Sequence, residues 1–324
     1  MLPVFDYARP KSLTDAFKHL SSKGAMVQAG GTDLLGCLRD RVFETSALVS
    51  LANIKELRGI ADTGNGVRIG ALTTITEIAT NPIIRDQYPV LAQAAVEVAS
   101  PQLRNQGTIG GNLCQKPRCW YYRGKFHCLR KGGQTCFAIT GQNQYHCILG
   151  GDECYIVHPS DTAPAFIALD ATVRVAGLQG TRTVPVEEFF VLPSKDPRRE
   201  TILEQGEIVT EILLPAPPNG LRSSYRKVRA RRSWDFAMAS VALALTLSGK
   251  QVAGARVVLG GAAPVPWRAR EAEEVITGKQ LDAAIITNAA EAAISKAQPM
   301  EHNQYKLALF RGLIEEQLQT IGVT

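Results

Sequence analysis

Hydrophobic and polar positions along residues 1–60 alternate between two periods, which indicates strands and helices in turn. Leu13–Leu20 repeats at the period of a helix, and Ser12 before it is a suitable N-cap. The Gly30–Gly31 pair ends one apolar run, and Thr32–Asp33 can begin another helix. Short apolar runs typical of buried strands lie at Val4–Tyr7, Ala25–Ala29 and Leu48–Leu51. We therefore expect this segment to be an α/β unit.

The same mixed pattern continues through residues 61–218. Thr73 or Thr74 can cap a helix, and Pro89 suits the first turn of the next one. Strand-like runs follow one another at Val67–Ala71, Thr172–Ala176, Arg182–Pro185 and Ile208–Leu214. The segment at about 115–155 lacks either period and is rich in cysteine. We expect a second unit here, interrupted by this cysteine-rich segment.

A linker at Pro215–Gly220 precedes a different pattern in residues 222–324. Two long strand-like runs come first and three helical stretches follow, which is typical of an α+β domain. The strands are expected at Phe236–Leu247 and Val252–Gly260, and the helices near Arg268–Thr277, Asp282–Ala297 and Asn303–Ile321. The whole chain is thus predicted to be α+β, with boundaries at 1–60, 61–218 and 222–324.

Composition changes this picture little. The 324 residues are 45% hydrophobic and 20% charged, as in ordinary globular proteins. No apolar run approaches the length of about 18 residues that a membrane span needs, and the N-terminus does not resemble a secretory signal. We therefore expect a cytoplasmic protein without a membrane span. The basic stretch Arg226–Arg232 has no accompanying aromatic stacking pattern, so no nucleic-acid partner is expected despite a net charge of +6.

Two glycine turns are candidate phosphate sites. Gly30–Gly31 lies between a strand and a helix, and Thr108–Asn112 repeats the theme with a second Gly-Gly pair. Glycine lets a ligand approach the backbone, and the amides at a helix start favour a pyrophosphate. Neither turn is the GxGxxG fingerprint of dinucleotide-binding folds. The alternative for the first turn is a tight connection capped by Thr32 or Asp33.

An acidic loop downstream offers a hydroxyl-binding group. Asp161, within His158–Asp161, can accept hydrogen bonds from ribityl or ribose hydroxyls. Alternatively it caps a helix that begins near Ala163.

Six of the seven cysteines lie in one short window, and Cys37 stands alone. Clustered thiols in a chain of this size favour metal binding over disulfides. Zinc sites usually contain close CxxC pairs, which are absent here, so the wide spacing favours an iron–sulfur cluster over zinc or over structural or redox thiols. Trp120–Tyr122 and other aromatic residues can shield such a cluster from water. The window contains Cys114, Cys119, Cys128, Cys136, Cys147 and Cys154.

The combination of motifs resembles the flavoprotein (medium) subunit of the molybdenum hydroxylases, the family of xanthine dehydrogenase and carbon monoxide dehydrogenase. The resemblance covers the whole chain. Most members run directly from the second glycine turn into the Asp-bearing loop, whereas residues 115–155 intervene here. The motifs that carry the resemblance are Ala29–Leu35, Thr108–Leu113, Ser160–Asp161 and Tyr225–Arg229.

The intervening segment is similar to an insertion in 4-hydroxybenzoyl-CoA reductase flavoprotein subunits and in bacterial periplasmic aldehyde oxidoreductases. In those relatives it carries an additional [4Fe–4S] cluster. The resemblance leaves out Cys114 and Cys147, with an exchange of Cys147 for Cys154 as the alternative. The ligands that it implies are Cys119, Cys128, Cys136 and Cys154.

The resemblance also implies the FAD site. Two segments would hold the diphosphate and ribityl chain, Asp161 would bind cofactor hydroxyls, and Lys227 would contact the flavin; the alternative for Lys227 is an exposed lysine on a strand. The cofactor-binding residues implied are Met26, Val27, Gln28, Ala29, Gly30, Gly31, Thr32, Asp33, Leu34, Thr108, Gly110, Gly111, Asn112, Asp161 and Lys227.

The fold implied is a two-lobed FAD-binding domain of the vanillyl-alcohol-oxidase (PCMH) type, followed by a smaller α+β domain. The function implied is that of an oxidoreductase subunit without catalytic residues of its own. It would transfer electrons between the [2Fe–2S] clusters of a small subunit, its FAD and [4Fe–4S] cluster, and an external acceptor or donor. A large molybdenum-cofactor subunit would complete a heterotrimer or a dimer of heterotrimers, and such a complex can be exported folded with a signal-bearing partner. The alternatives are a stand-alone FAD oxidase of the same fold and a zinc-stabilised binding protein.

Overall fold

The computed structural model describes residues 1–322 and begins with a small parallel sheet. We call it the N-terminal sheet. Its strands lie in the order β1 (Asp6–Ala8), β3 (Ala47–Ser50) and β2 (Ala25–Gln28). The connecting helices are α1 (Leu13–Leu20) and α2 (Leu34–Arg39). The predicted cap of α1 is confirmed, because the hydroxyl of Ser12 accepts a hydrogen bond from the amide of Asp15 over 3.2 Å.

The central sheet is antiparallel, and helices from before and after the cysteine-rich segment pack against it. Its strands lie in the order β4 (Ile60–Asp62), β5 (Gly66–Gly70), β8 (Ile208–Pro215), β6 (Thr172–Gly177) and β7 (Gly180–Pro185). Thr74 caps α3 in a capping box with Glu77, as the sequence predicted. The helices are α3 (Ile75–Thr80), α4 (Pro82–Gln87), α5 (Pro89–Glu97), α6 (Pro101–Gln106), α7 (Ile109–Leu113) and α9 (Thr162–Ala168), and the short 3-10 turns are η1 (Lys55–Leu57) and η3 (Val186–Glu188).

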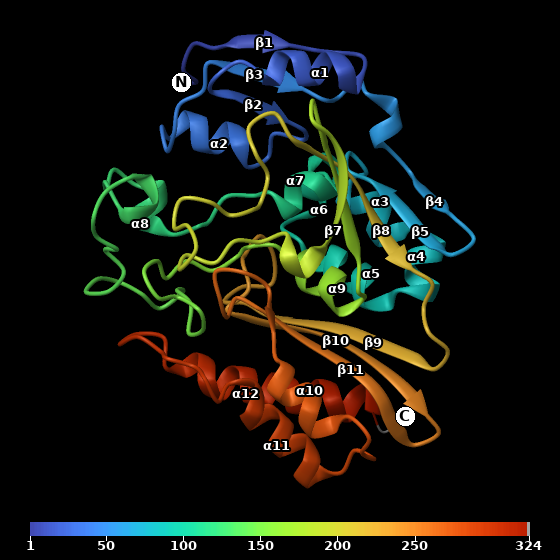
Figure 1. Cartoon of the computed structure of the whole chain (residues 1–324). Coiled ribbons are helices and arrows are strands. Elements are labelled where there is room, and N and C mark those ends of the chain that lie inside the picture. Colours follow the sequence, from blue (N-terminus) through green and yellow to red (C-terminus); the bar gives the residue numbers. More distant parts are fainter. Residues whose placement is uncertain (323–324) are drawn as a thin grey trace.

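Residues 216–220 connect β8 to the C-terminal sheet, which is antiparallel and has helices on one face (Figure 1). Its strands lie in the order β12 (Trp267–Arg268), β11 (Gln251–Gly260), β10 (Ala239–Ser248) and β9 (Leu221–Val228). The helices are α10 (Arg270–Ile276), α11 (Ala283–Ala293) and α12 (Tyr305–Gly322). The strand expected from Phe236 begins only at Ala239, because residues 229–238 form a loop after β9. The predicted α+β architecture is confirmed.

Strand β10 contributes side chains to two hydrophobic cores, because successive side chains point to opposite faces of the sheet. Ala242 and Ala244 face the core of the central sheet, whereas Val241, Leu243 and Leu245 face the core beneath α10, α11 and α12. The C-terminal sheet is therefore covered on both faces.

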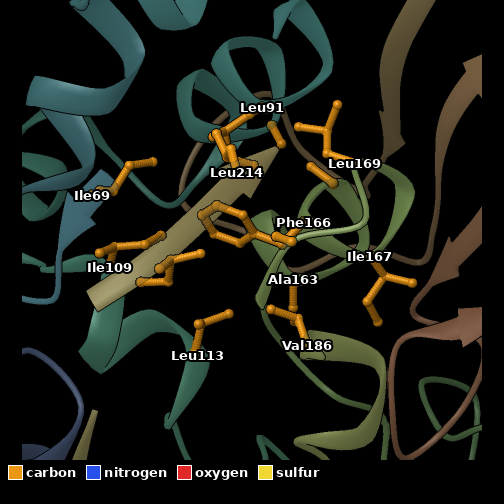
Figure 2. Close-up of a cluster of buried hydrophobic side chains, with 14 of the residues drawn as sticks. Ile69, Leu91, Ile109, Leu113, Ala163, Phe166, Ile167, Leu169, Val186 and Leu214 are labelled. Carbon is orange, nitrogen blue, oxygen red and sulfur yellow. The ribbon is translucent and has the colours of Figure 1, made fainter. Parts of the chain in front are cut away.

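The core of the central sheet is built around α9. Figure 2 shows the Phe166 ring surrounded by side chains that come from both strands and helices. Ile69 and Leu214 reach it from the sheet, and Leu91 and Ile109 from α5 and α7. Helix α9 is buried along its whole length, so the loop that precedes it is fixed in place.

The cysteine-rich segment, residues 115–157, has little regular structure. Its short helical turns are α8 (Trp120–Arg123) and η2 (Leu129–Lys131). The segment lies beside α2 and close to the start of α12 (Figure 1). It is thus held between the N-terminal and C-terminal parts of the chain.

No helix within residues 1–322 is both long enough and apolar enough to cross a bilayer. The cytoplasmic location expected from the sequence stays a prediction.

Replacing Phe166 by alanine is expected to lower the free energy of unfolding by about 3–5 kcal/mol, because it leaves a cavity in the core that supports α9. Chemical denaturation followed by circular dichroism measures the loss. Leu178→Ala is the matched control, since this side chain is 62% exposed in the β6–β7 turn. Equal midpoints for the two variants would contradict the central role of Phe166.

Candidate functional site

The first glycine turn connects β2 to α2 and requires glycine at two positions. Gly31 has a φ of +72°, in the left-handed region that favours glycine. A Cβ atom on Gly30 would lie 2.1 Å from the carbonyl oxygen of Gln106. The Gln106 side chain also donates a hydrogen bond to the Gly30 carbonyl oxygen over 3.1 Å. The first turn is therefore packed against the residues that lead into the second.

The second glycine turn begins α7 and is tied to the Asp161 loop. The Thr108 hydroxyl caps the helix by accepting from the amide of Gly111 over 3.3 Å. The side-chain oxygen of Asn112 accepts hydrogen bonds from the hydroxyls of Ser160 at 2.5 Å and Thr162 at 2.7 Å. The structure thus brings both glycine turns and the acidic loop together.

The other residues of the first predicted segment follow β2 into the turn. Met26, Val27 and Gln28 are half-buried, and so is Leu34 at the start of α2. The side-chain oxygen of Gln28 is buried and has no hydrogen-bond partner within residues 1–322. A buried amide oxygen without a partner is unfavourable. This atom is therefore suited to accept a hydrogen bond from a bound ligand.

Asp161 is the centre of a buried polar cluster and does not cap α9. Its carboxylate oxygens accept from Tyr225 Oη at 2.8 Å and from Lys227 Nζ at 2.7 Å, while the hydroxyl of Ser160 caps the helix. The alternative of a capping role for Asp161 is wrong. The Lys227 side chain is buried on β9, so the alternative of an exposed lysine is wrong too. Burial raises the pKa of Asp161, and the Lys227 charge partly offsets that effect.

Asp33 likewise does not cap its helix through its side chain. Its carboxylate lies 2.9 Å from the guanidinium of Arg118 and 2.7 Å from that of Arg123, and it accepts from the amide of Lys116 over 2.7 Å. The alternative in which Asp33 caps the first turn is therefore wrong, because the partners of its side chain come from the cysteine-rich segment. Thr32 makes no side-chain cap to α2 either, since the N-cap position belongs to Asp33.

A cavity with about 290 Å³ of space not filled by protein atoms, partly open to solvent, adjoins Asp161. The guanidinium of Arg118 lies 4.7 Å from the ring centre of Phe236, in the loop after β9. The Arg118 Nε atom is buried and has no hydrogen-bond partner in the described chain. The lining residues are Arg118, Val157, His158, Pro159, Ser160, Asp161, Phe236, Ala237, Ser240 and Gly261.

The four cysteines implied as ligands line a second cavity in the cysteine-rich segment, which has about 290 Å³ of space not filled by protein atoms and is partly open to solvent. Aromatic side chains surround it, with Tyr121 5.1 Å from Phe126 and stacked on Phe137 at 6.1 Å between ring centres. The cysteines that line the cavity are Cys119, Cys128, Cys136 and Cys154. No group of three or more His, Cys, Asp or Glu side chains in residues 1–322 is arranged to hold a single metal ion.

Backbone amides converge on the sulfur atoms of these cysteines. Cys119 lies at the start of α8 and accepts from the amides of Tyr121 and Tyr122, which lower its pKa, although burial raises it overall to about 11. The Cys136 thiol has a lowered pKa because the Cys154 thiol donates a hydrogen bond to it, and further backbone amides favour its thiolate. The amide donors favour the negatively charged form of these sulfur atoms, whereas burial opposes it.

The other cysteines lie outside this cavity. Burial raises the pKa of Cys114 to about 12 and that of Cys37 to about 11. The sulfur of Cys37 lies 2.7 Å from the guanidinium of Arg123. Cys147 is fully buried and does not line the cavity. The lining therefore favours Cys154 over Cys147, but the ligand set stays a prediction.

His146 lies in the wall of the same cavity, and its Nε2 atom is 3.3 Å from the Cys119 sulfur. Burial, together with the positive charge of Lys306, lowers its pKa to about 4. Lys306 is itself buried, with a pKa lowered to about 8, and donates to the carbonyl oxygen of Gly261 over 2.7 Å. These groups lie at the contact between the cysteine-rich segment and α12.

The sequence analysis missed the charged residues that fix this segment. Arg118, Arg123 and Arg130 alternate with the cysteines, and buried Arg130 faces Glu200 at 3.3 Å. Arginines close to cysteines and aromatic residues are a signal that the sequence analysis could have used. A buried guanidinium requires an acidic or carbonyl partner, so such arginines indicate buried ion pairs or hydrogen bonds. His146 was missed as well, although it directly precedes a cysteine.

Comparisons with known proteins cover nearly the whole chain. The family described as "FAD binding domain in molybdopterin dehydrogenase" matches residues 3–217, and "CO dehydrogenase flavoprotein C-terminal domain" matches residues 223–321. The chain is 36% identical to the aldehyde oxidoreductase FAD-binding subunit PaoB of Escherichia coli, covering 95% of each chain. It is 30% identical to the carbon monoxide dehydrogenase medium chain of Hydrogenophaga pseudoflava, covering 98% of this chain and 96% of that one.

Solved structures agree with these sequence matches. The carbon monoxide dehydrogenase of Hydrogenophaga pseudoflava superposes with a TM-score of 0.79 at 30% identity, over 99% of this chain and 98% of that one. Quinoline 2-oxidoreductase from Pseudomonas putida 86 gives 0.78 at 25% identity, with the same coverage. The predicted fold, an FAD-binding domain followed by a smaller α+β domain, is confirmed. The chain therefore belongs to the FAD-binding medium subunits of the molybdenum hydroxylase family, which are subunits of oxidoreductases.

Proposed function

We propose that the chain is the electron-transfer flavoprotein subunit of a molybdenum-containing hydroxylase or dehydrogenase complex. The observation that supports this most directly is the continuous series of contacts in the site. It runs from the glycine turns through Asp33 to the cysteine-lined cavity, so a flavin site and a cluster site would share one rigid support. The related medium chains belong to complexes, which supports a large molybdenum-cofactor partner and a small [2Fe–2S] partner.

The two glycine turns fit the diphosphate and ribityl chain of FAD. The absence of a Cβ at Gly30 lets the two turns pack directly against each other, and the Gln28 side-chain oxygen has no hydrogen-bond partner within residues 1–322. We assign Met26–Leu34 and Thr108–Asn112 to this part of the cofactor. Bound FAD supplies a group that exchanges electrons singly or in pairs.

Asp161 and Lys227 fit hydroxyl and flavin contacts, respectively. The Lys227 ammonium has three N–H donors, of which two serve Asp161 and the carbonyl oxygen of Glu97. One N–H is left for the cofactor. Each Asp161 oxygen accepts one protein hydrogen bond and retains capacity for a ribityl hydroxyl. The ion pair therefore orients both side chains and leaves each of them able to make a further hydrogen bond.

The cysteine-lined cavity fits a [4Fe–4S] cluster. Such a cluster requires four thiolates, and Cys119, Cys128, Cys136 and Cys154 line one cavity. Amide donors to the sulfurs and the aromatic cover are features that tune such clusters. We propose these four as ligands. The cluster would serve as a relay to an external acceptor or donor.

Replacing Gly30 by alanine is expected to reduce the FAD content of the purified complex at least several-fold. The new methyl group would lie 2.1 Å from the Gln106 carbonyl oxygen, so the two glycine turns must separate. Flavin absorbance per chain measures the effect. Gly36→Ala is the control, because a Cβ there meets nothing within 4 Å. Normal FAD content in the Gly30 variant would contradict the assignment of the turn.

Replacing Cys154 by serine is expected to remove the iron and the broad absorbance near 400 nm, because one thiolate ligand is lost. Cys147→Ser is the matched control and should keep both, since its side chain is buried outside the cavity. Iron and zinc are measured per chain in both variants. The reverse result would make Cys147 the ligand, and bound zinc without iron in the wild type would refute the cluster.

The relay role leads to a separate expectation for Cys119→Ser. Losing the cluster should leave reduction of the flavin by substrate unchanged and slow turnover with the external acceptor at least tenfold. Stopped-flow reduction and steady-state turnover of the whole complex separate the two steps. Unchanged turnover in a variant that lacks the cluster but keeps its FAD would show that the cluster is not on the electron path.

A further inference from the structure

His146 has no role in the assignments above, yet it is held in an unusual place. Its ring is buried in the wall of the cysteine-lined cavity, and Nε2 lies 3.3 Å from the sulfur of Cys119. The other ring nitrogen, Nδ1, has no hydrogen-bond partner within residues 1–322. The sulfur is therefore the side-chain group that the structure places within hydrogen-bond distance of this buried ring, and the carbonyl oxygen of Asn143 is the backbone group that acts on it.

The backbone around His146 is fixed by the C-terminal domain. Asn303, just before α12, donates from its side chain to the carbonyl oxygens of His146 and Cys147, both over 3.1 Å. The amide of His302 donates to the side-chain oxygen of Asn143 over 2.9 Å. Because both sides of the loop are tied down, the ring has little freedom to turn away from Cys119.

The chemistry of the sulfur selects the proton position on the ring. A cysteine that ligates iron is a thiolate and can only accept hydrogen bonds. If Nε2 carried the lone pair, two acceptors would face each other at 3.3 Å in a buried site. With the proton on Nε2, the ring donates to the sulfur. The His146–Cys119 pair therefore favours the Nε2–H form.

We propose that His146 donates a hydrogen bond from Nε2 to the Cys119 sulfur and thereby raises the reduction potential of the cluster. The inference rests on the proposed [4Fe–4S] site. Reduction adds negative charge that is shared with the ligand sulfurs, and a fixed donor stabilises the reduced form more than the oxidised form. His146 is thus a positioning and tuning residue that acts through Cys119.

His146→Phe removes the donor but keeps a planar ring, whereas His146→Gln places an amide N–H at a similar distance. The midpoint potential of the cluster is measured in the whole complex by redox titration with electron paramagnetic resonance. We expect the Phe variant to be harder to reduce by about tenfold in the equilibrium constant, or about 59 mV for one electron. The Gln variant should recover most of this shift. The flavin potential serves as the internal reference and should not move.

An unchanged potential in a Phe variant that retains its iron overturns the inference. Should that variant lose its iron, the wild-type complex decides the question. With ¹⁵N-labelled histidine, pulsed resonance on the reduced cluster should detect coupling to one histidine nitrogen, and its absence overturns the hydrogen bond. A wild-type complex without iron refutes the proposed cluster itself, which is a distinguishable result.

Discussion

The carboxylate of Asp33 is the interaction on which the arrangement of the site depends. It lies at the end of the first glycine turn and meets two guanidinium groups and one amide from the cysteine-rich segment. Taking these charges out of water is unfavourable unless they are paired, and removing Asp33 would leave two guanidinium groups without their carboxylate. This requirement fixes an irregular segment against the N-terminal sheet without help from regular secondary structure. The glycine turn and the cysteine-lined cavity consequently share one support.

A second ion pair, Asp161–Lys227, fixes the other half of the site. It links the loop before α9 to strand β9 of the C-terminal sheet, and Tyr225 completes the carboxylate's partners. Because both residues are buried, the pair also fixes how closely the C-terminal sheet approaches the central sheet. The cavity beside Asp161 therefore takes its shape from two domains.

Local sequence patterns predicted much of the fold, because helix caps and buried strand faces depend on residues that lie close together in the sequence. Ser12 and Thr74 cap helices from adjacent residues, and the alternation in β10 shows which faces are buried. The roles of Asp33 and Lys227 were not readable in this way. Their partners lie 90 and 66 residues away in the sequence, and nothing nearby distinguishes a capping aspartate from one in a buried ion pair. The family resemblance supplied the candidate site residues, and the structure supplied the contacts among them.

The contacts of Asn303 have a consequence for biosynthesis. This residue closes the loop at His146, although it is translated 157 residues later. On the ribosome the cysteines emerge long before the helix that fixes them, so their loop cannot yet have its final shape. Insertion of the proposed cluster should therefore follow the docking of α12 rather than accompany synthesis of the cysteine-rich segment. A chain that ends before Asn303 would therefore expose its cysteine thiols, because the loop that encloses them would lack the contacts that fix its shape.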